Sequence, residues 1–434
     1  MFADVQTRRD LELFEARDGG PSIVTTLDRT TTEDGSRRLR EIVRAPCASA
    51  DEIRSRHESL SYLVEIDTPF GVADDGIRRV RKYLESTFTT LPSRPKPLAY
   101  AEAAWWAVRY PEVVGHARRG IGATRHLVRS FVGYAQSVAS REMPEGLAEL
   151  VQEGLEIAES LRPLLRPARS AWVALSSDRG LRGGVRPTAE RLLAIVAELD
   201  ALTGAARLLR EGFVLPVVDD RGPSMRGEGL WHPFVQDPVG NPVDLEGGDA
   251  LVFLTGPNMA GKTTYLKSVG VCLYLAHCGL PVPAHSFRFT PVDRLTTGLS
   301  PEDNLRRGVS YFLAEVRRVK DVVEAIARGE RTVAIFDEVF RGTNVRDALD
   351  ATRAVLLGCA RARTSMFLFS SHLVELADEL ADHPRLRFCH FEGELTGDRL
   401  EFSYRLRPGV SDQRFGMELL RREGLPDLLE SIPA

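Results

Sequence analysis

The sequence has few of the features that identify a class of protein directly, and cysteine is the first of them. Only five cysteines occur in 434 residues, with no CxxC spacing and no accompanying set of histidines. Neither a zinc site nor a disulfide framework is therefore predicted, and the cysteines are expected to be small buried residues in a reducing compartment. They are Cys47, Cys272, Cys278, Cys359 and Cys389.

Membrane and targeting signals are also lacking. The N-terminus alternates charges instead of presenting a basic start and an apolar core, so it does not predict a secretory signal. The longest apolar run, residues 269–284, is interrupted by His277, Gly279 and two prolines and is too short to cross a bilayer. We therefore expect a cytoplasmic protein with no membrane partner.

An excess of positive charge is missing as well. The formal net charge is −4, with 27% charged and 43% apolar residues, which is typical of an ordinary globular chain. This composition excludes a strongly basic nucleic-acid module. Any polyanion would therefore have to bind at local patches.

The length and the apolar patterns predict two domains of different class. A chain of 434 residues is long enough for two or three domains. Up to about residue 210, apolar residues recur at three- and four-residue intervals, which predicts helices. Residues 217–242 are rich in Gly, Pro and Asp, and beyond them β-branched runs alternate with helical patterns. We expect an α/β protein with an all-α domain, residues 1–212, followed by a domain with a mostly parallel sheet, residues 213–434.

One segment of the second domain has the pattern of a phosphate-binding loop. After the apolar run LVFLT, residues 256–263 read GPNMAGKT, which fits G-x-x-x-x-G-K-[ST] and precedes a helical pattern. This context disfavours the alternative, a glycine turn formed by chance. Lys262 would bridge the β and γ oxygens of ATP, Thr263 would bind Mg²⁺, and Thr264 would reach the α-phosphate. The predicted nucleotide-binding residues are Gly256, Pro257, Asn258, Met259, Ala260, Gly261, Lys262, Thr263 and Thr264.

Two further apolar runs end in candidate catalytic residues. Asp337 and Glu338 follow residues 333–336, and ligands gather at the carboxyl ends of parallel strands. Asp337 would complete the magnesium site, and Glu338 would act as general base on the attacking water. His372 follows another run and would sense the γ-phosphate. Alone, these residues would fit a solvated turn and a structural histidine, but the upstream loop favours a catalytic role for them and for Lys262.

Several motifs together resemble those of one family. GPNMAGKTT, GVSYFLAEV, FDEVFRGTN and SSHLVEL are similar to motifs of the ATPase domain of the MutS family, within the ABC superfamily. The similarity extends over residues 227–426, and two stretches of the helical half resemble the core and lever domain of the same family. The resemblance implies a helical core and lever domain, with the clamp reduced or absent, followed by an ABC-type P-loop ATPase domain that uses ATP and Mg²⁺.

The resemblance also implies that two ATPase domains face each other and share their sites in a homodimer. Ser310 would then reach the γ-phosphate held by the partner, and Asn258 would contact phosphate or the lytic water. Residues 341–344 would lie at the dimer face. Ser310 would in any case suit the cap of the helix that starts at Tyr311, and both roles can hold.

The sequence departs from the family pattern at several places. No mismatch-reading domain precedes the helical core, and residues 65–187 are too few for both the lever helices and a full clamp. Phe340 and Ala348 stand where the family has glycines, and Pro238 or Val239 replaces the aromatic residue that stacks on adenine. Mismatch recognition, the interface loop and the selectivity for adenine are therefore expected to differ from the family.

Two clusters of basic residues are the candidates for DNA contacts, since arginines suit backbone phosphates. A solvated helix face and a surface loop explain these clusters equally well. Trp105 and Trp106 sit among alanines and are predicted to be core residues, so they do not predict a stacking platform for single strands. The first cluster contains Arg118, Arg119, Arg125 and Arg129, and the second contains Arg179, Arg182 and Arg186.

Together these features predict an ATP hydrolase that dimerises on ATP and holds DNA in repair or recombination. Branched or junction DNA is the favoured substrate, because we expect no mismatch-reading domain before the helical core. Two other functions fit the sequence. One is an ATP-gated protein-interaction switch that binds no nucleic acid, and the other is a component of mismatch repair.

Overall fold

The computed structural model describes residues 1–92, 95–246, 251–299, 311–396, 399–411, 413, 424–430 and 432. Contacts divide the chain into two units. The sheet unit comprises residues 1–26, 46–53 and 212–434, and the helical unit comprises residues 27–45 and 54–211. Residues 1–26 belong to the sheet unit because α1 (Val5–Asp10) packs against β6 (Arg294–Gly298). The linear domain boundary near residue 212 stays a prediction.

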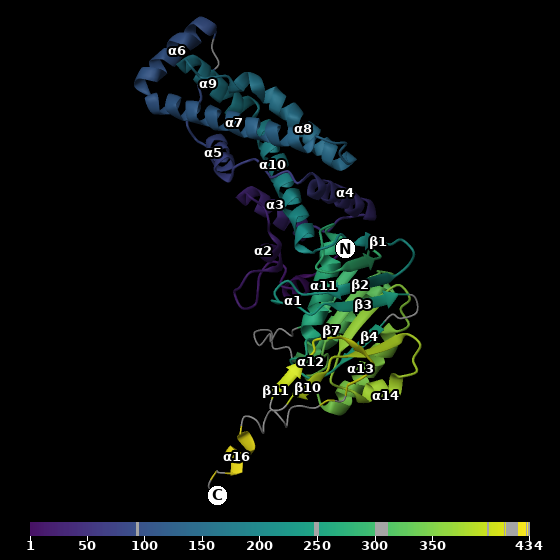
Figure 1. The fold of residues 1–434 in the computed structure, drawn as a ribbon. Coiled ribbons are helices and arrows are strands. Elements are labelled where there is room, and N and C mark those ends of the chain that lie inside the picture. The colour runs from purple at the N-terminus through teal and green to yellow at the C-terminus, as the bar shows by residue number, and fades with distance from the viewer. Residues whose placement is uncertain are drawn as a thin grey trace. The chain divides into compact units, whose positions relative to one another are not determined.

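The described residues of the helical unit form helices and connecting loops, in agreement with their three- and four-residue apolar periodicity. The longest helix, α7, packs against α5, α8 and α9, while α10 packs against α3 and α8 (Figure 1). A π-helical turn joins α9 to α10. The elements are α3 (Glu33–Arg44), α4 (Ala50–Ile66), α5 (Asp74–Leu84), α6 (Lys96–Arg109), α7 (Pro111–Val138), α8 (Glu145–Leu161), η1 (Arg162–Leu165), α9 (Ala171–Arg179), η2 (Gly180–Gly184), α10 (Arg186–Arg207) and η3 (Leu208–Glu211).

The two adjacent tryptophans of α6 have opposite environments. Trp106 is buried with Ala99 and Ala103, on the face of α6 that packs against α7 and α9. Trp105 is 55% exposed, so the prediction that it belongs to the core is wrong. Successive residues of a helix point about 100° apart, and α6 buries only one of its faces.

The sheet unit contains a six-stranded sheet with the order β12-β9-β4-β8-β7-β6. Five of these strands are parallel, and the short β12 pairs antiparallel with β9. This arrangement confirms the prediction of a mostly parallel sheet in the C-terminal half. The strands are β4 (Leu251–Thr255), β6, β7 (Thr332–Asp337), β8 (Met366–Ser370), β9 (Leu386–His390) and β12 (Arg407–Pro408).

Helices cover both faces of this sheet, which explains why its strands are continuous apolar runs. Phe253, Phe336 and Phe369 share one face and belong to a core cluster with residues of α12 (Tyr311–Ala327) and α13 (Val345–Cys359). Ile335 points to the opposite face. There it lies close to Gly270 of α11 (Lys262–His277), where an added Cβ would be 3.5 Å from the Ile335 Cδ1 atom.

The remaining described elements complete the sheet unit. A second sheet has the order β1-β5-β2-β3, with β2 antiparallel to both of its neighbours. None of the described helices is long and apolar enough to cross a membrane. All five cysteines are buried and none forms a disulfide, as predicted. The elements are α2 (Ile23–Leu27), β1 (Val217–Val218), β2 (Ser224–Leu230), β3 (Asn241–Glu246), β5 (Ser286–Phe289), α14 (Glu375–Leu380), β10 (Gly393–Thr396), β11 (Arg399–Phe402) and α16 (Leu425–Glu430).

Candidate functional site

The carboxyl ends of β4, β7 and β8 bring the candidate catalytic segments to one edge of the sheet. The backbone N–H of Glu338 donates to the Ser370 carbonyl oxygen at 2.8 Å, and that of Ser371 donates to the Leu254 oxygen at 3.0 Å. Neighbouring parallel strands end at the same edge, so Asp337, Glu338 and His372 lie beside the loop that follows β4.

The loop between β4 and α11 depends on glycine at its first position. Gly256 has φ +127°, and an added Cβ would lie 2.3 Å from the carbonyl oxygen of Phe391. Gly261 has φ +103° and precedes the first residue of α11. Met259 adopts φ +69° although it carries a side chain. The chain therefore turns sharply here, and the N-terminus of α11 faces the interior of the loop.

Lys262 is the first residue of α11, and its side chain is buried within the loop. Its Nζ donates to the carbonyl oxygens of Gly256 at 2.6 Å and Pro257 at 3.0 Å. Burial lowers the pKa of Lys262 to about 8, with Arg341 acting in the same direction and Asp337 opposing it. A buried ammonium group whose contacts are uncharged carbonyls is well suited to receive an anion.

Thr263 and Asp337 form a pair of oxygen donors next to Lys262. The Thr263 hydroxyl donates to Oδ2 of Asp337, and Oδ1 of Asp337 is buried with no hydrogen-bond partner among the described residues. Hydroxyl and carboxylate oxygens are the donors that Mg²⁺ prefers, and Mg²⁺ usually takes its other ligands from water and substrate phosphates. Within the described part of the chain, no group of three or more His, Cys, Asp or Glu side chains could hold a metal ion. The two residues fit magnesium bound together with a nucleotide.

Glu338 is almost fully buried and its backbone has φ +53°. The carboxylate lies between two nitrogen donors. His372 Nε2 is 2.5 Å from Oε1, and the Arg341 guanidinium forms an ion pair at Oε2. The Arg341 guanidinium thus lies against one oxygen of this carboxylate and the His372 imidazole against the other.

His372 follows β8 and remains partly exposed. Burial lowers its pKa to about 4, and the positive charges of Lys262 and Arg341 act in the same direction. The imidazole is therefore neutral near pH 7, and it can donate its Nε2 proton to Glu338 without adding charge to the site.

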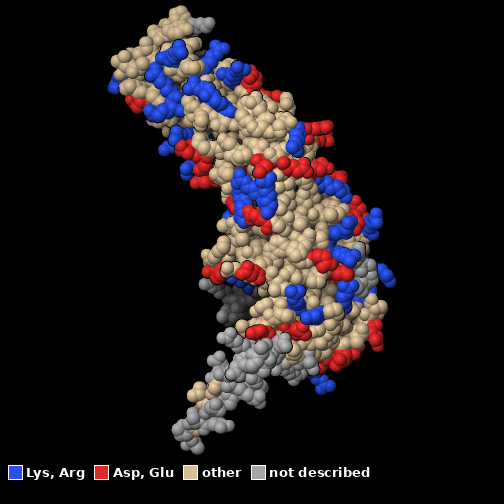
Figure 2. Space-filling view, viewed as in Figure 1, with Lys and Arg blue, Asp and Glu red and all other residues tan. Residues whose placement is uncertain are grey.

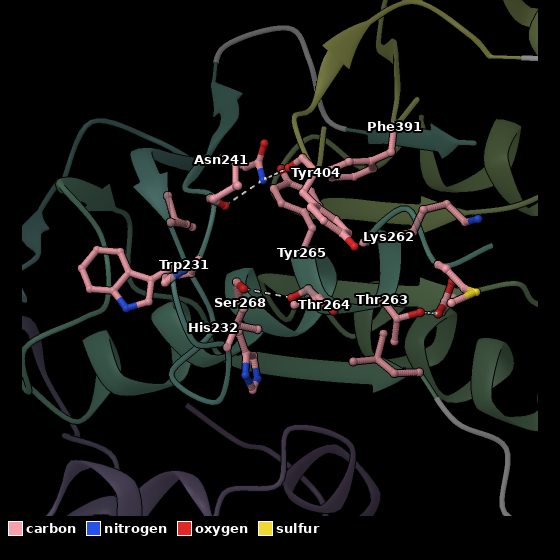
Figure 3. A pocket seen from close by; sticks show the side chains of 18 of the residues that line it. Trp231, His232, Asn241, Lys262, Thr263, Thr264, Tyr265, Ser268, Phe391 and Tyr404 are labelled. Atoms are coloured by element: carbon pink, nitrogen blue, oxygen red, sulfur yellow. Dashed lines mark hydrogen bonds between the residues drawn. The ribbon is translucent and has the colours of Figure 1, made fainter. Parts of the chain in front are cut away.

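A pocket of about 690 Å³ opens above these residues, within the size range of small-molecule sites (Figure 3). The β2–β3 connection supplies one wall, and the loop after β4 supplies another. Pro238 and Val239, one of which is predicted to stand where the family pattern has an aromatic residue, both line it. The lining also includes Trp231, His232, Asn241, Pro257, Asn258, Lys262, Thr263, Thr264, Tyr265, Asp337, Glu338, Arg341, Phe391 and Tyr404.

Tyr404 is a pocket residue that sequence reasoning missed. Its side chain is near Gly261, where an added Cβ would lie 3.3 Å from the Tyr404 Cδ1 atom (Figure 3). Asn241 holds this segment, because its Nδ2 donates to the Tyr404 carbonyl oxygen at 2.9 Å and its Oδ1 accepts from the Leu406 N–H at 2.7 Å. The only signal in the sequence is an aromatic residue after a β-rich run, more than 100 positions from the loop, and this signal is too weak to identify it.

The segments implied to lie at a dimer face are only partly described. Ser310 lies outside the described residues, and α12 begins at Tyr311. Asn344 is the N-cap of α13 and accepts a hydrogen bond from the Asp347 N–H at 2.9 Å. Phe340 is buried with φ +68°, a conformation that favours glycine, the residue of the family pattern at this position.

The arginines proposed for DNA contacts differ in their solvent exposure and in their ion pairs. Figure 2 shows Lys and Arg gathered over the end of the helical unit where α6 and α7 lie. Arg118, Arg119 and Arg129 of α7 are exposed, Arg125 and Arg179 are half-buried, and Arg186 pairs with Glu190.

Arg182 requires a correction. Its side chain is only 5% exposed and pairs at 2.5 Å with the fully buried Asp178. It also donates to the Phe88 carbonyl oxygen at 2.7 Å, and Asp178 accepts a hydrogen bond from the Tyr83 hydroxyl. The guanidinium is used inside the helical unit and does not lie on the surface to meet a phosphate.

Comparison with protein families gives a match in each half of the chain. The model described as MutS domain V matches residues 252–431, and the model described as MutS domain III matches residues 6–91. The first range includes the loop after β4 and the Asp337, Glu338 and His372 segments. The second lies in the N-terminal, mostly helical half.

Individual relatives agree with the two family models. A protein of Natronomonas pharaonis named DNA mismatch repair protein MutS is 34% identical over 257 residues, which cover 57% of this chain and 30% of the relative. A protein of the same name from Chloroflexus aurantiacus is 33% identical over 326 residues, covering 68% and 32%. DNA mismatch repair protein MutS 2 of Halobacterium salinarum is 32% identical over 259 residues, covering 57% and 29%. The chain thus spans about a third of the length of these relatives.

Proposed function

Because the chain belongs to the MutS family, we propose that it binds ATP with Mg²⁺ in the pocket above β4 and β7 and hydrolyses it. The observation that carries the proposal is the geometry of the loop after β4. It combines a buried lysine with a Thr263–Asp337 pair that leaves one carboxylate oxygen without a hydrogen-bond partner among the described side chains. A P-loop that holds a nucleoside triphosphate requires these groups at these positions.

The phosphates would bind where the Lys262 ammonium now contacts the loop carbonyls. Lys262 would hold the β- and γ-phosphate oxygens, and the backbone N–H groups of residues 256–264 would surround the chain of phosphates. Thr263 and Asp337 would hold Mg²⁺. When bound, the ion neutralises the charge that develops on the phosphate oxygens. Phosphate binding would return Lys262 to its fully protonated form, because the anion favours the charged amine.

Glu338 would act as general base on the water that attacks the γ-phosphorus atom. The Nε2 atom of His372 lies 2.5 Å from one oxygen of the carboxylate, where the neutral imidazole would donate its proton and fix the orientation of Glu338. The other oxygen is paired with Arg341 and becomes available once the guanidinium moves toward the phosphates. The water oxygen would bond to the γ-phosphorus atom while the P–O bond to ADP breaks, and the water proton would pass to Glu338. Glu338 would release this proton to the departing phosphate or to solvent as ADP and phosphate leave.

The base of the nucleotide would lie between the β2–β3 connection and Tyr404. Pro238 and Val239 offer apolar surface without an aromatic ring. Tyr404 also lines the pocket, and this residue, which is 46% exposed, offers an aromatic ring that would contact a face of the base. Aromatic stacking on the base would therefore rest on Tyr404.

ATP would also control a DNA-holding cycle. We propose that two chains dimerise through their ATPase domains, with Ser310 completing the partner's site, and that the helical units hold branched or junction DNA. The exposed arginines of α7 support this proposal, since phosphate contacts need accessible guanidinium groups. The names of the relatives, which refer to DNA mismatch repair, support a role in that class of process.

A second candidate function rests on a different surface. On α6, the side chains of Leu98, Trp105 and Val108 are 58%, 55% and 85% exposed, and they follow one another at spacings of seven and three residues. An apolar stripe of this kind suits a protein partner more than a phosphate backbone. An ATP-gated protein-interaction switch without DNA binding is therefore the alternative.

Nucleotide binding and turnover test the ATPase proposal. Lys262→Ala should abolish binding of a fluorescent ATP analogue, whereas Glu338→Gln should retain binding and lose phosphate release. Lys320→Ala, at an exposed lysine paired with Glu324 on α12, is the matched control and should behave as the wild type. Wild-type affinity in Lys262→Ala, or normal turnover in Glu338→Gln, would contradict the proposed roles.

DNA binding separates the two candidate functions. Fluorescence anisotropy with duplex, mismatched and four-way-junction DNA, at increasing salt and with ATP present, should show tightest binding to the junction and a strong salt dependence. Retention of no DNA at low salt would leave the protein-interaction switch as the better candidate.

A further inference from the structure

The first turn of α12 contacts the loop that follows Glu338 at two points. Phe312 and Glu315 lie one turn apart on α12 and therefore share a face of the helix. The Phe312 ring packs edge-on against the Phe340 ring, with the centroids 5.8 Å apart. The backbone N–H groups of Gly342, Phe340 and Arg341 lie close enough to the Glu315 carboxylate to oppose the rise of its pKa on burial. Helix and loop are thus joined by an apolar and a polar contact.

The backbone conformation of Phe340 creates the N–H donor site that faces this carboxylate. A residue in the left-handed region turns successive N–H groups toward one point, which makes a concave anion-binding site. For a residue with a Cβ this conformation costs about 1–2 kcal/mol, and it persists only where the surroundings impose it. Here the surroundings are the core cluster around the Phe340 ring, which is 3% exposed.

The Glu315 carboxylate is partly buried, unlike that of a typical surface glutamate. Burial raises the pKa of its carboxyl to about 6, while the three N–H groups and the Arg341 charge partly oppose that shift. Its Oε2 atom is buried and has no hydrogen-bond partner in the described parts of the chain. A carboxylate in this setting is costly unless the loop N–H groups keep it in place, so its position and that of the loop depend on each other.

Arg341 connects this contact to the catalytic carboxylate. Its backbone N–H lies close to the Glu315 carboxylate, and its guanidinium is paired with Glu338. A shift of the α12 start would move the Arg341 backbone, and with it the guanidinium that covers the Glu338 oxygen.

We propose that Glu315 is a positioning residue that ties the Glu338–Arg341 loop to the first turn of α12 and thereby sets when Glu338 is free to act as base. The inference rests on the proposed ATPase function. Residue 310, implied by the family resemblance to reach the partner's phosphate, directly precedes α12. The contact would transmit the arrival of a partner subunit to the water-activating carboxylate.

The test uses the full chain with Glu315→Gln and Glu315→Ala, and Glu324→Gln as matched control. Glu324 lies on the same helix, is about half exposed and pairs with Lys320. We expect both Glu315 variants to bind the fluorescent ATP analogue within about twofold of the wild-type affinity. Their kcat should fall by about tenfold or more, less in Gln because it keeps an acceptor oxygen. Glu324→Gln should match the wild type in both measurements.

A double-mutant cycle with Arg341→Ala distinguishes positioning from general stabilisation. If Glu315 acts through Arg341, then Glu315→Ala should have little further effect on kcat in the Arg341→Ala background. Circular dichroism shows whether each variant is folded. If Glu315→Ala does not fold, the cycle is measured with Glu315→Gln instead.

Two results would overturn the inference. One is a wild-type kcat in the Glu315 variants, and the other is full additivity of their effect with that of Arg341→Ala. A wild-type chain that binds no ATP would instead sink the proposed function, so the two failures are distinguishable.

Discussion

Replacement of Phe340 tests whether this position carries backbone strain. Phe340 is 3% exposed and has φ +68°. Loss of a buried Phe ring to Ala costs about 3–5 kcal/mol, whereas relief of the left-handed backbone returns about 1–2 kcal/mol and occurs only with Gly. The greater freedom of Gly in the unfolded chain costs about 0.5–1 kcal/mol. Both variants should therefore be less stable than the wild type, and Phe340→Gly should be more stable than Phe340→Ala by about 0.5–1 kcal/mol.

At most positions a variant with Ala is more stable than one with Gly. The predicted order of Phe340→Gly and Phe340→Ala is the reverse, so measuring the two stabilities tests the strain directly. Urea unfolding followed by circular dichroism gives the free energies, and hydrogen exchange of the β7 and β8 amides assigns the change to the sheet unit. Ala348 is the matched control, because it also stands where the family has glycine but lies within α13 with no positive φ. Ala348→Gly should destabilise by about 0.5–1 kcal/mol.

If Phe340→Ala is the more stable of the two variants, position 340 carries no backbone strain that glycine relieves. Equal stability of the wild type and Phe340→Gly would show instead that the ring contributes only about 0.5–1 kcal/mol to the core, the net gain that glycine brings at this backbone conformation. In the first case the carboxylate site that binds Glu315 would also lose its structural explanation.

Three further predictions concern other parts of the molecule. Tyr404→Ala should weaken ATP binding by about 1–3 kcal/mol, the range for an aromatic ring stacked on a base, while Tyr404→Phe should bind as the wild type does. A titration with the fluorescent analogue measures both affinities. Equal affinity of the wild type and the two variants would contradict a role of Tyr404 in binding the base. Burial lowers the pKa of His277 to about 4 from 6.5, so its contribution to stability is complete above pH 6.5 and is lost as the pH falls toward 4. The free energy of unfolding should decrease over that range by up to about 3 kcal/mol more than in His277→Gln, and parallel pH profiles would refute this. Arg182→Ala should destabilise the helical unit by about 3–5 kcal/mol in urea unfolding, because it leaves the buried Asp178 carboxylate without its partner. Arg118→Ala should leave the free energy of unfolding unchanged and weaken binding to junction DNA.

Most residues of the proposed ATP site could be predicted from local sequence patterns. The strand, loop and helix around residues 256–264 form a continuous segment, so their arrangement depends on contacts within a few residues. Asp337 and His372 each follow an apolar strand, and parallel strands end at the same edge. That rule is enough to bring the two residues together with the loop, although their roles in ATP hydrolysis stay predictions.

Residues whose environment depends on distant segments could not be predicted in the same way. Arg182 reads as part of a basic glycine-rich loop, yet it is buried against Asp178 because Tyr83 and Phe88 arrive from another helix and its loop. Trp105 and its neighbour have the same local composition, and only the packing of α6 decides which one is covered.

The sequence by itself determined the two unlike halves of the chain, the mostly parallel sheet, the phosphate-loop pattern and the family. These properties follow from hydrophobic periodicity and from motifs that are read over a few turns or strands. Only the tertiary structure decided that Tyr404 lines the pocket, that Glu315 binds the loop after Glu338, and that Phe340 takes a conformation suited to glycine. The reason is physical, since each of these depends on close packing between segments far apart in the chain, and local preferences do not specify such packing.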